Sequence, residues 1–311
     1  MKIITHEDIM DLKINYNELY EWIKDSFNSK DSAILPGKTS ITQPNGIFFN
    51  TMPSMMDDVF GVKVVTRKSD RKPTIDSQIY LYNKDTYNVE CILDGNYITA
   101  MRTAAVSVLS IDLLAKKDFK TISFMGLGLV SVATLKMICE IFKGRDFTIK
   151  LLKYKDQHTE LIERFKSYDN LTFAVEENIE NLVKGSDVLL SAITYTDGTV
   201  SEYEWYDEGV LVLPVHVKGF SNIDKKFDKV FMDDFNNTKV IEGVEDIRYK
   251  CEITSLLNDL SLGRQNDKEK IVSYNIGLST HDILFANNIF KKFSNKNNDI
   301  YLNKIEDKIW L

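Results

Sequence analysis

The chain reads TISFMGLGLVS from Thr121 to Ser131, and this stretch decides how its second half is expected to fold. Its first five residues are typical of a short buried β-strand, and a helical pattern follows over residues 130–142. Gly126 and Gly128 stand between them. The first glycine permits a tight turn, and the second lets a pyrophosphate approach the backbone at the start of the helix. The stretch therefore predicts a strand, a phosphate-binding turn and a helix; a glycine turn without a ligand is the alternative.

Strands and helices alternate through the rest of this half. Further strands are predicted at residues 147–152, 171–175, 188–192 and 210–215, and helices at residues 159–165 and 179–183. This alternation predicts a parallel sheet that is covered on both faces. The expected fold class is α/β, with a Rossmann-type doubly wound parallel sheet. The tail from Asp267 to Phe293 is expected to be helical.

The first part of the chain has a different pattern. Residues 34–90 alternate between apolar and polar side chains and contain several prolines, which predicts antiparallel strands and turns. Helices are expected on either side of this region, at residues 15–28 and 97–116. The expected domains are a β-rich domain at residues 1–117, completed by about residues 282–311, and a dinucleotide-binding domain at residues 118–281.

The composition is that of an ordinary globular protein. The 311 residues include 39 Lys and Arg and 46 Asp and Glu, a net charge of −7, so a nucleic-acid partner is not expected. The sequence lacks the ~18 uninterrupted apolar residues of a membrane span, and it begins with acidic residues where a signal peptide is apolar. Three distant cysteines and four scattered histidines indicate neither disulfides nor a metal site. A cytoplasmic protein without a membrane partner is expected.

The end of the second predicted strand bears on the choice of cofactor. A cation there accommodates the 2′-phosphate of NADP, whereas an acid binds the ribose hydroxyl of NAD. Lys153 and Lys155 come before Asp156, which favours NADP. A solvated charge cluster is the alternative.

Two cations of the first part stand in apolar surroundings. The alternation of residues 60–65 places Lys63 on the face opposite Val62 and Val64, and Arg102 begins a helix face of small residues. A guanidinium suits a substrate carboxylate, and a lysine can bind a carboxylate, a carbonyl or an imine. A structural ion pair is the alternative for each.

These segments resemble the ornithine cyclodeaminase/mu-crystallin family. That family has a strand with a G-x-K core, a D-G-x-x-x-T-A-x-R-T-A-A stretch, and a G-x-G turn about twenty residues later. The resemblance extends over nearly the whole chain. The segments that carry it are Met52-Pro53, Gly61-Val62-Lys63, Asp94–Ala105, Gly126-Leu127-Gly128 and Gly277–Asp282 with Ala286. The resemblance implies an NAD(P) enzyme acting on an α-amino acid or its imine, with an amino-terminal domain that binds substrate and forms a homodimer.

The resemblance also implies site residues. Arg102 and Lys63 would hold the substrate carboxylate and the reacting centre, and the third cation of the family falls on Lys38, which lacks the guanidinium fork. The candidate cofactor contacts are Thr103, Gly126, Gly128, Leu129, Val130, Lys155, Ala192 and Thr194.

The acid/base aspartate of the family's cyclodeaminases has no counterpart at the expected place. The count from Gly209 reaches Lys218, Asp224 fits only with a gap, and His216 is the neighbour whose ordinary pKa suits proton transfer. His216 and Lys218 are therefore candidate catalytic residues beside Lys63, although a structural role is an alternative for the histidine.

Three functions follow from these observations. The first is an NAD(P)-dependent oxidoreductase of imines or α-amino acids, either a ketimine reductase or an amino-acid dehydrogenase. The second is ornithine cyclodeaminase, which converts ornithine to proline and ammonia and which Lys218 disfavours. The third is a non-enzymatic protein that binds NADPH or a small ligand.

Overall fold

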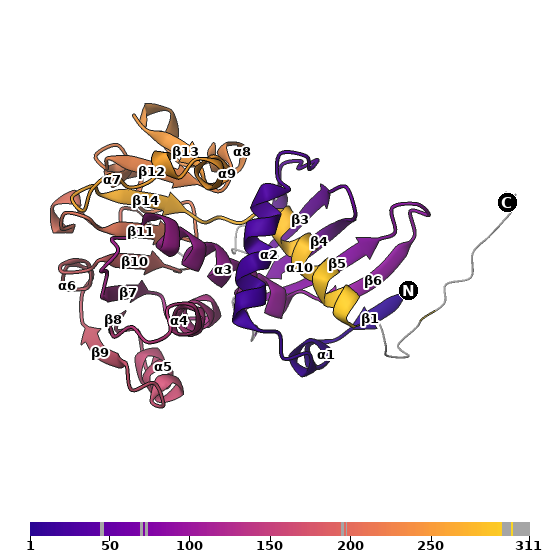
Figure 1. Cartoon of the computed structure of the whole chain (residues 1–311), viewed down its shortest axis with the longest axis horizontal. Coiled ribbons are helices and arrows are strands. Elements are labelled where there is room, and N and C mark those ends of the chain that lie inside the picture. The colour runs from indigo at the N-terminus through magenta and orange to yellow at the C-terminus, as the bar shows by residue number, and fades with distance from the viewer. Residues whose placement is uncertain are drawn as a thin grey trace, which may run out of the picture. The chain divides into compact units, whose positions relative to one another are not determined.

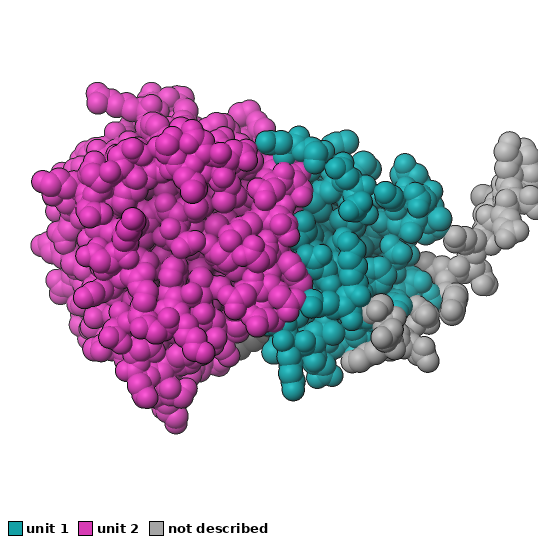
Figure 2. Space-filling model, in the orientation of Figure 1, with its two compact units in different colours: residues 1–14, 31–99, 282–311 teal, residues 15–30, 100–281 magenta. Residues whose placement is uncertain are grey.

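The computed structural model describes residues 1–43, 47–68, 71, 74–193, 196, 198–293 and 300. Its contacts divide the chain into two compact units (Figure 2). Unit 1 comprises residues 1–14, 31–99 and 282–311, and unit 2 comprises residues 15–30 and 100–281. The chain passes from one unit to the other inside two helices, after Thr99 and after His281. The domain bounds at residues 117 and 281 stay a prediction.

Unit 1 is built on a six-stranded sheet in the order β1-β6-β5-β4-β3-β2. Its strands are β1 (Lys2–Ile4), β2 (Thr39–Thr42), β3 (Phe48–Met55), β4 (Phe60–Arg67), β5 (Ile75–Tyr82) and β6 (Val89–Asp94). Neighbours from β2 to β6 pair in antiparallel fashion, as the alternation predicts. The sheet also contains β1, which pairs parallel to β6. A short helix, α1 (His6–Asp11), follows β1 and begins with a capping box between Thr5 and Asp8.

Unit 2 is built on an eight-stranded sheet in the order β13-β12-β14-β11-β10-β7-β8-β9 (Figure 1). Every pair of neighbours is parallel, which confirms the predicted α/β class with a doubly wound parallel sheet. The strands are β7 (Thr121–Met125), β8 (Phe147–Leu152), β9 (Leu171–Glu176), β10 (Val188–Ser191), β11 (Leu211–Pro214), β12 (Lys229–Met232), β13 (Lys250–Glu252) and β14 (Ile271–Tyr274). The strand order reverses between β7 and β10, and ligands bind at such a switch point in open α/β sheets.

The helices that follow α1 are α2 (Tyr16–Asn28), α3 (Asn96–Leu114), α4 (Leu129–Ile141), α5 (Gln157–Phe165), α6 (Ile179–Val183), α7 (Ser221–Asp224), α8 (Phe235–Thr238), α9 (Ile253–Asn258) and α10 (Ser279–Lys292). Helices α2 to α6 begin and end close to the predicted positions, whereas α7, α8 and α9 were not predicted. Helix α3 is long and apolar enough to cross a membrane, but 78% of its most apolar 18-residue stretch is buried inside the protein. A buried apolar helix of this kind is typical of a protein core.

One expectation is wrong. The tail from Asp267 to Phe293 is not helical throughout, because residues 271–274 form β14 and helix α10 begins only at Ser279. All four residues of β14 are buried between β11 and β12. An apolar run of four residues carries no periodicity that separates a strand from a buried helix.

Candidate functional site

The glycine turn joins β7 to α4, as predicted, and it lies at the switch point of the parallel sheet. Gly126 has a φ of +88°, and a Cβ there would lie 2.8 Å from the carbonyl oxygen of Ala192, so only glycine fits. Gly128 is the N-cap of α4 and has a φ of −77°. A Cβ added to Gly128 would meet no atom within 4 Å, so the space in front of the helix is open.

This open helix terminus fits an anion. The first N–H groups of a helix have no partner inside the helix, and its dipole favours negative charge there. The Ser131 hydroxyl donates to the Gly126 carbonyl at 2.6 Å and so keeps that oxygen occupied. Leu129 opens the helix and is 62% exposed, and Val130 follows it. The turn can therefore hold a pyrophosphate, and the cofactor-binding predictions for Gly126, Gly128, Leu129 and Val130 agree with its geometry.

The remaining predicted cofactor contacts have different surroundings. Ala192 directly follows β10, beside the glycine turn, and Thr103 is buried in α3. Thr194 lies outside the described residues. At the end of β8, the Lys153 ammonium lies 2.6 Å from a Glu177 carboxylate oxygen.

Lys155 lies two residues further on. Its backbone has a φ of +49°, and its Nζ lies 5.3 Å from the centre of the Tyr154 ring. It is the predicted cation that could face the 2′-phosphate of a cofactor.

Lys63 lies on the face of β4 opposite Val62 and Val64, as the alternation predicts, and this face is buried. Its ammonium is 1% exposed and donates to Asp282 Oδ1 at 2.9 Å. Asp282, in the first turn of α10, is fully buried. The pairing of Asp282 with Lys63 could not be predicted from the sequence, because the two residues are 219 positions apart.

Arg102 lies in α3 within unit 2 and is 6% exposed. Its guanidinium packs where Gly277 would carry a side chain, and Gly277 has a φ of +92°. The N–H of Gly277 donates to Asp233, a fully buried residue directly after β12. Burial raises the pKa of Asp233 to about 7, against the opposing effects of the Gly277 N–H and the positive charge of Arg102. Gly277 therefore contacts both the Arg102 guanidinium and the buried carboxyl group of Asp233.

His216 follows β11 and is held by the neighbouring strand. Its Nε2 lies 2.7 Å from the Ser191 hydroxyl at the end of β10. Burial lowers the pKa of the imidazole to about 4, although a backbone hydrogen bond with Lys218 opposes the shift. His216 is therefore neutral at pH 7 and has no proton to donate as an imidazolium.

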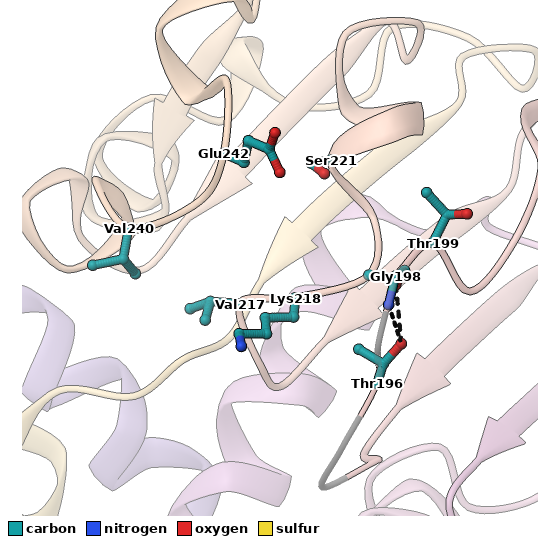
Figure 3. A pocket seen from close by; sticks show the side chains of 9 residues that line it. Thr196, Gly198, Thr199, Val217, Lys218, Ser221, Val240 and Glu242 are labelled. Atoms are coloured by element: carbon teal, nitrogen blue, oxygen red, sulfur yellow. Dashed lines mark hydrogen bonds between the residues drawn. The ribbon is translucent and has the colours of Figure 1, made fainter. Parts of the chain in front are cut away.

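Lys218 is exposed and lines a pocket beyond the carboxyl ends of β10 and β11. The pocket has a volume of about 440 Å³, within the range of small-molecule sites. Figure 3 shows that Thr196 and Thr199 come from the segment after β10, Val217 and Lys218 from the segment after β11, and Glu242 from beyond α8. The pocket lies on the same edge of the sheet as the glycine turn, because all these segments follow parallel strands.

Two further residues bear on the predicted site. Lys38 is exposed and directly precedes β2 in unit 1. Asp224 is 2% exposed in α7 and accepts a hydrogen bond from the Tyr274 hydroxyl at 2.6 Å. Asp224 is therefore engaged within the core of unit 2. Among the described residues, no group of three His, Cys, Asp or Glu side chains could hold a metal ion.

A doubly wound parallel sheet with an open glycine turn at its switch point defines a nucleotide-binding α/β protein. Within that class, the chain belongs to the ornithine cyclodeaminase/mu-crystallin family, whose model matches residues 2–297. The family and fold predicted from the sequence are thereby confirmed.

Two of the relatives are bacterial proteins of similar length. The nodulation efficiency protein NfeD of Rhizobium meliloti is 26% identical over 268 residues, which cover 82% of this chain and 83% of the relative. N-((2S)-2-amino-2-carboxyethyl)-L-glutamate dehydrogenase of Staphylococcus aureus is 28% identical over 270 residues, 79% of this chain and 78% of the relative.

Solved structures share the fold over nearly the whole chain. Δ1-Pyrroline-2-carboxylate reductase of Thermococcus litoralis, in complex with NADH and L-proline, has a TM-score of 0.83 and 22% identity. It covers 94% of this chain and 97% of its own. An archaeal alanine dehydrogenase dimer with bound NAD has a TM-score of 0.82 and 21% identity. The match covers 96% of this chain and 97% of the dehydrogenase chain. The prediction that the chain is an enzyme agrees with these reductases and dehydrogenases.

Proposed function

We propose that the protein is an NAD(P)-dependent oxidoreductase that reduces an α-imino acid or oxidises the corresponding α-amino acid. The observation that carries the proposal is the open amino terminus of α4 at Gly128, at the switch point of the parallel sheet. Relatives that act on pyrroline-carboxylate, on alanine and on a substituted glutamate support the substrate class.

The residues present fit a dinucleotide. The backbone N–H groups of Leu129 and Val130 would hold the pyrophosphate, and Gly128 leaves room for it. Lys155 would face a 2′-phosphate, which favours NADPH over NADH. The bound nicotinamide supplies or accepts a hydride, while the protein provides binding, orientation and charge.

The substrate is recognised by its charges. A carboxylate in a buried site must be paired with a cation, and the planar fork of Arg102 can bond both of its oxygens. We also propose Lys63 and Lys38 of unit 1 as substrate contacts, and Lys38 lacks the guanidinium fork. Gly277 supports this role of Arg102 because the guanidinium occupies the space that a side chain would fill.

The cyclodeaminase alternative requires an acid/base group beside the substrate amine. Lys218 stands where the family's aspartate is expected, His216 is neutral with a pKa of about 4, and Asp224 is hydrogen-bonded in the core. These three side chains favour hydride transfer without ring-closing deamination. The similarity to a probable ornithine cyclodeaminase, at 14% identity, concerns the fold.

The setting of the enzyme is also part of the proposal. We infer a homodimer, because an archaeal dehydrogenase of the same fold is a dimer and the edge of the unit 1 sheet exposes apolar side chains. Ile41 on β2 and Phe49 on β3 are register partners and are 64% and 44% exposed. The cytoplasm is inferred from the buried free thiols of Cys91, Cys139 and Cys251, which suit a reducing compartment.

The test offers a panel of substrates to the protein and measures the change in NAD(P)H absorbance with each of them. Cyclic imino acids, and α-keto acids with ammonia or an amine, should consume NADPH or NADH in equal amounts with product. Proline and ammonia formed from ornithine with catalytic NAD, without net NADH, would instead identify a cyclodeaminase. Tight binding of NAD(P)H without turnover on any member of the panel would favour the non-enzymatic alternative.

A further inference from the structure

Lys218 is a pocket residue to which the proposed reaction gives no role. It lines the pocket of about 440 Å³ beyond the carboxyl ends of β10 and β11, and its side chain is exposed. All the residues that line this pocket belong to unit 2, so its geometry is defined within one compact unit. The attachment of Lys218 and the charges around it indicate which group the pocket receives.

The turn that carries Lys218 is fastened to β10 on its amino-terminal side. The N–H of Val215 donates to the Ser191 carbonyl oxygen at 3.0 Å, and His216 Nε2 lies 2.7 Å from the Ser191 hydroxyl. The imidazole of His216 also forms a hydrogen bond with the backbone of Lys218. The end of β10 therefore holds two residues of the turn, and the second of them holds the backbone of Lys218.

Gly219 fastens the same turn on its carboxyl-terminal side. Its carbonyl oxygen accepts a hydrogen bond from the N–H of Val200 at 2.9 Å, and an added Cβ would lie 2.9 Å from Val200 Cγ1. Its φ of +99° is one that glycine adopts readily. The backbone of Lys218 is thus held between two attached neighbours, and this limits the positions that its ammonium can reach.

The ammonium of Lys218 has no ion-pair partner among the described residues. The three lysines that follow in the chain do have partners, which are Asp246 for Lys225, Glu204 for Lys226 and Glu269 for Lys229. The protein carries 46 acidic and 39 basic side chains, so partners for a lysine are plentiful. A fixed turn that presents an unpaired cation to a pocket is suited to bind an anion.

Glu242 lines the same pocket but does not neutralise Lys218. Figure 3 shows its carboxylate well apart from the Lys218 ammonium. The hydrogen bond to Asp246 raises the pKa of Lys225, and the negative charge of Glu242 contributes to this shift. Lys225 therefore partly compensates the charge of Glu242, and Lys218 is left as an uncompensated charge at the pocket.

The anionic groups of a bound dinucleotide would be held elsewhere in unit 2. The pyrophosphate fits the open end of α4 at Gly128, and Lys155 after β8 would face a 2′-phosphate. These residues follow β7 and β8, whereas Lys218 follows β11 on the other side of the switch point. Each half of a doubly wound sheet receives one half of a dinucleotide. The side of Lys218 would therefore receive the nicotinamide half, where the substrate reacts.

We infer that Lys218 binds a second carboxylate of the substrate, and that the preferred substrates are α-imino acids with two carboxylates. The inference rests on the proposed function and deepens it by naming the substrate class. An ammonium is a compact point charge that binds a carboxylate from many directions. The hydroxyls of Thr199 and Ser221 line the same pocket and can donate further hydrogen bonds to it. The α-carboxylate stays assigned to Arg102.

The main experiment compares substrates of similar shape that differ in one charge. 2-Oxoglutarate and 5-methyl-2-oxohexanoate, each with ammonia, differ in that an isopropyl group replaces the distal carboxylate. Pyruvate with β-alanine or with 3-methylbutylamine makes the same comparison for a carboxylate carried on the nitrogen. In at least one of the two pairs, kcat/KM of wild type should be at least tenfold higher for the diacid. An equal or lower value for the diacid in both pairs overturns the inference.

Lys218→Gln removes the charge from an exposed side chain and should melt within about 1 °C of wild type. It should lower kcat/KM for the preferred diacid at least tenfold, mainly through KM, with a loss below threefold for the isostere. The control is Lys226→Gln, which removes the same charge from an exposed lysine of unit 2 outside the pocket and should keep the preference of wild type.

Two other outcomes would overturn the inference. An equal loss for the diacid and its isostere in Lys218→Gln would assign Lys218 to the α-carboxylate or to the hydride transfer itself. A tenfold loss of NADPH affinity in the same variant would assign Lys218 to the cofactor, whereas we expect the Kd for NADPH to stay within twofold of wild type.

A binding measurement keeps this inference distinguishable from the proposed function. Glutarate has two carboxylates and no carbon that exchanges a hydride, and 5-methylhexanoate is its match with one carboxylate. By calorimetry, the NADPH-loaded wild type should bind glutarate at least tenfold more tightly than Lys218→Gln does, and both should bind 5-methylhexanoate alike. A wild type that shows this difference but turns over no imino, keto or amino acid contradicts only the proposed function. An active wild type with equal glutarate affinity in Lys218→Gln contradicts only the role of Lys218.

Discussion

Gly126 and Gly128 lie two residues apart and are glycine for different reasons. Gly126 must be glycine for the chain to fold, because its φ is positive and the Ala192 carbonyl fills the place of a side chain. Gly128 has an ordinary φ and empty space around it, so only a ligand would be disturbed by a side chain there.

This contrast gives a prediction at the scale of single residues. Gly128→Ala should leave the melting temperature within about 1 °C of wild type, since a surface change without new contacts alters stability little. It should raise the Kd for NADPH at least tenfold, and Gly128→Asp should abolish binding. Gly126→Ala should instead lower the melting temperature by several degrees. Fluorescence titration with NADPH and thermal unfolding of the three variants provide the test. Unchanged NADPH affinity in Gly128→Asp would place the cofactor elsewhere.

Asp224 gives a prediction for pH. Burial raises its pKa to about 7, although the hydrogen bond from Tyr274 opposes the shift. The folded protein therefore binds a proton that the unfolded chain releases near pH 4, so this residue makes the free energy of unfolding fall as the pH rises from about 4 to about 7.

The matching variant is Asp224→Asn, whose amide oxygen can still accept from Tyr274. Urea unfolding at pH 8 should show this variant more stable than wild type by on the order of 2 kcal/mol, and the difference should be small at pH 4. Asp169→Asn, at an exposed position, is the control and should match wild type at both pH values. A constant difference between pH 4 and pH 8 would show that Asp224 does not titrate in this range.

The prediction at the scale of elements concerns the end of β8. Lys153 is already bound to Glu177, whereas Lys155 adopts a positive φ and lies beside Tyr154. Lys155→Glu should weaken NADPH binding about tenfold or more and leave NADH binding within about threefold, because a carboxylate repels the 2′-phosphate. The control is Lys143→Glu, which makes the same charge change at an exposed position after α4. An unchanged ratio of the two Kd values in Lys155→Glu would remove the basis for preferring NADP.

Most elements of unit 2 were predictable from the sequence, and three strands were not. Strand β8 and helix α6 begin and end at the predicted residues, and the short buried strands β10 and β11 were also predicted. Strands β12, β13 and β14 have only three or four residues each, and a run of that length does not separate a strand from a helix.

The site divides in the same way. Gly126, Gly128 and Lys63 could be recognised from local pattern, since a glycine turn and a strand alternation are contained in a few residues. The roles of Asp282, Asp233 and Gly277 depend on contacts with residues far away in the chain. The lowered pKa of His216 could not be predicted from the sequence, because burial causes the shift.

At the scale of the whole molecule, the prediction concerns assembly. Ile41 and Phe49 form an exposed apolar pair at the β2 edge of the unit 1 sheet, and such edges readily pair with another chain. Sedimentation should give twice the chain mass of 35.8 kDa for wild type, and Ile41→Lys with Phe49→Lys should give monomers. Leu260→Lys, a charge at a 66% exposed position of unit 2, should remain dimeric. A wild-type monomer would contradict the proposed homodimer.

The Lys63–Asp282 pair also has a consequence for synthesis of the protein on the ribosome. The lysine is made 219 residues before its aspartate, a delay of roughly 10 to 40 s at translation rates of about 5–20 residues per second. During that time the strand carrying Lys63 cannot bury its ammonium beside a carboxylate of α10. The sheet of unit 1 must therefore wait for α10, whereas most strands of unit 2 have already emerged. The nascent chain should thus gain protease resistance in unit 2 before it does so in unit 1.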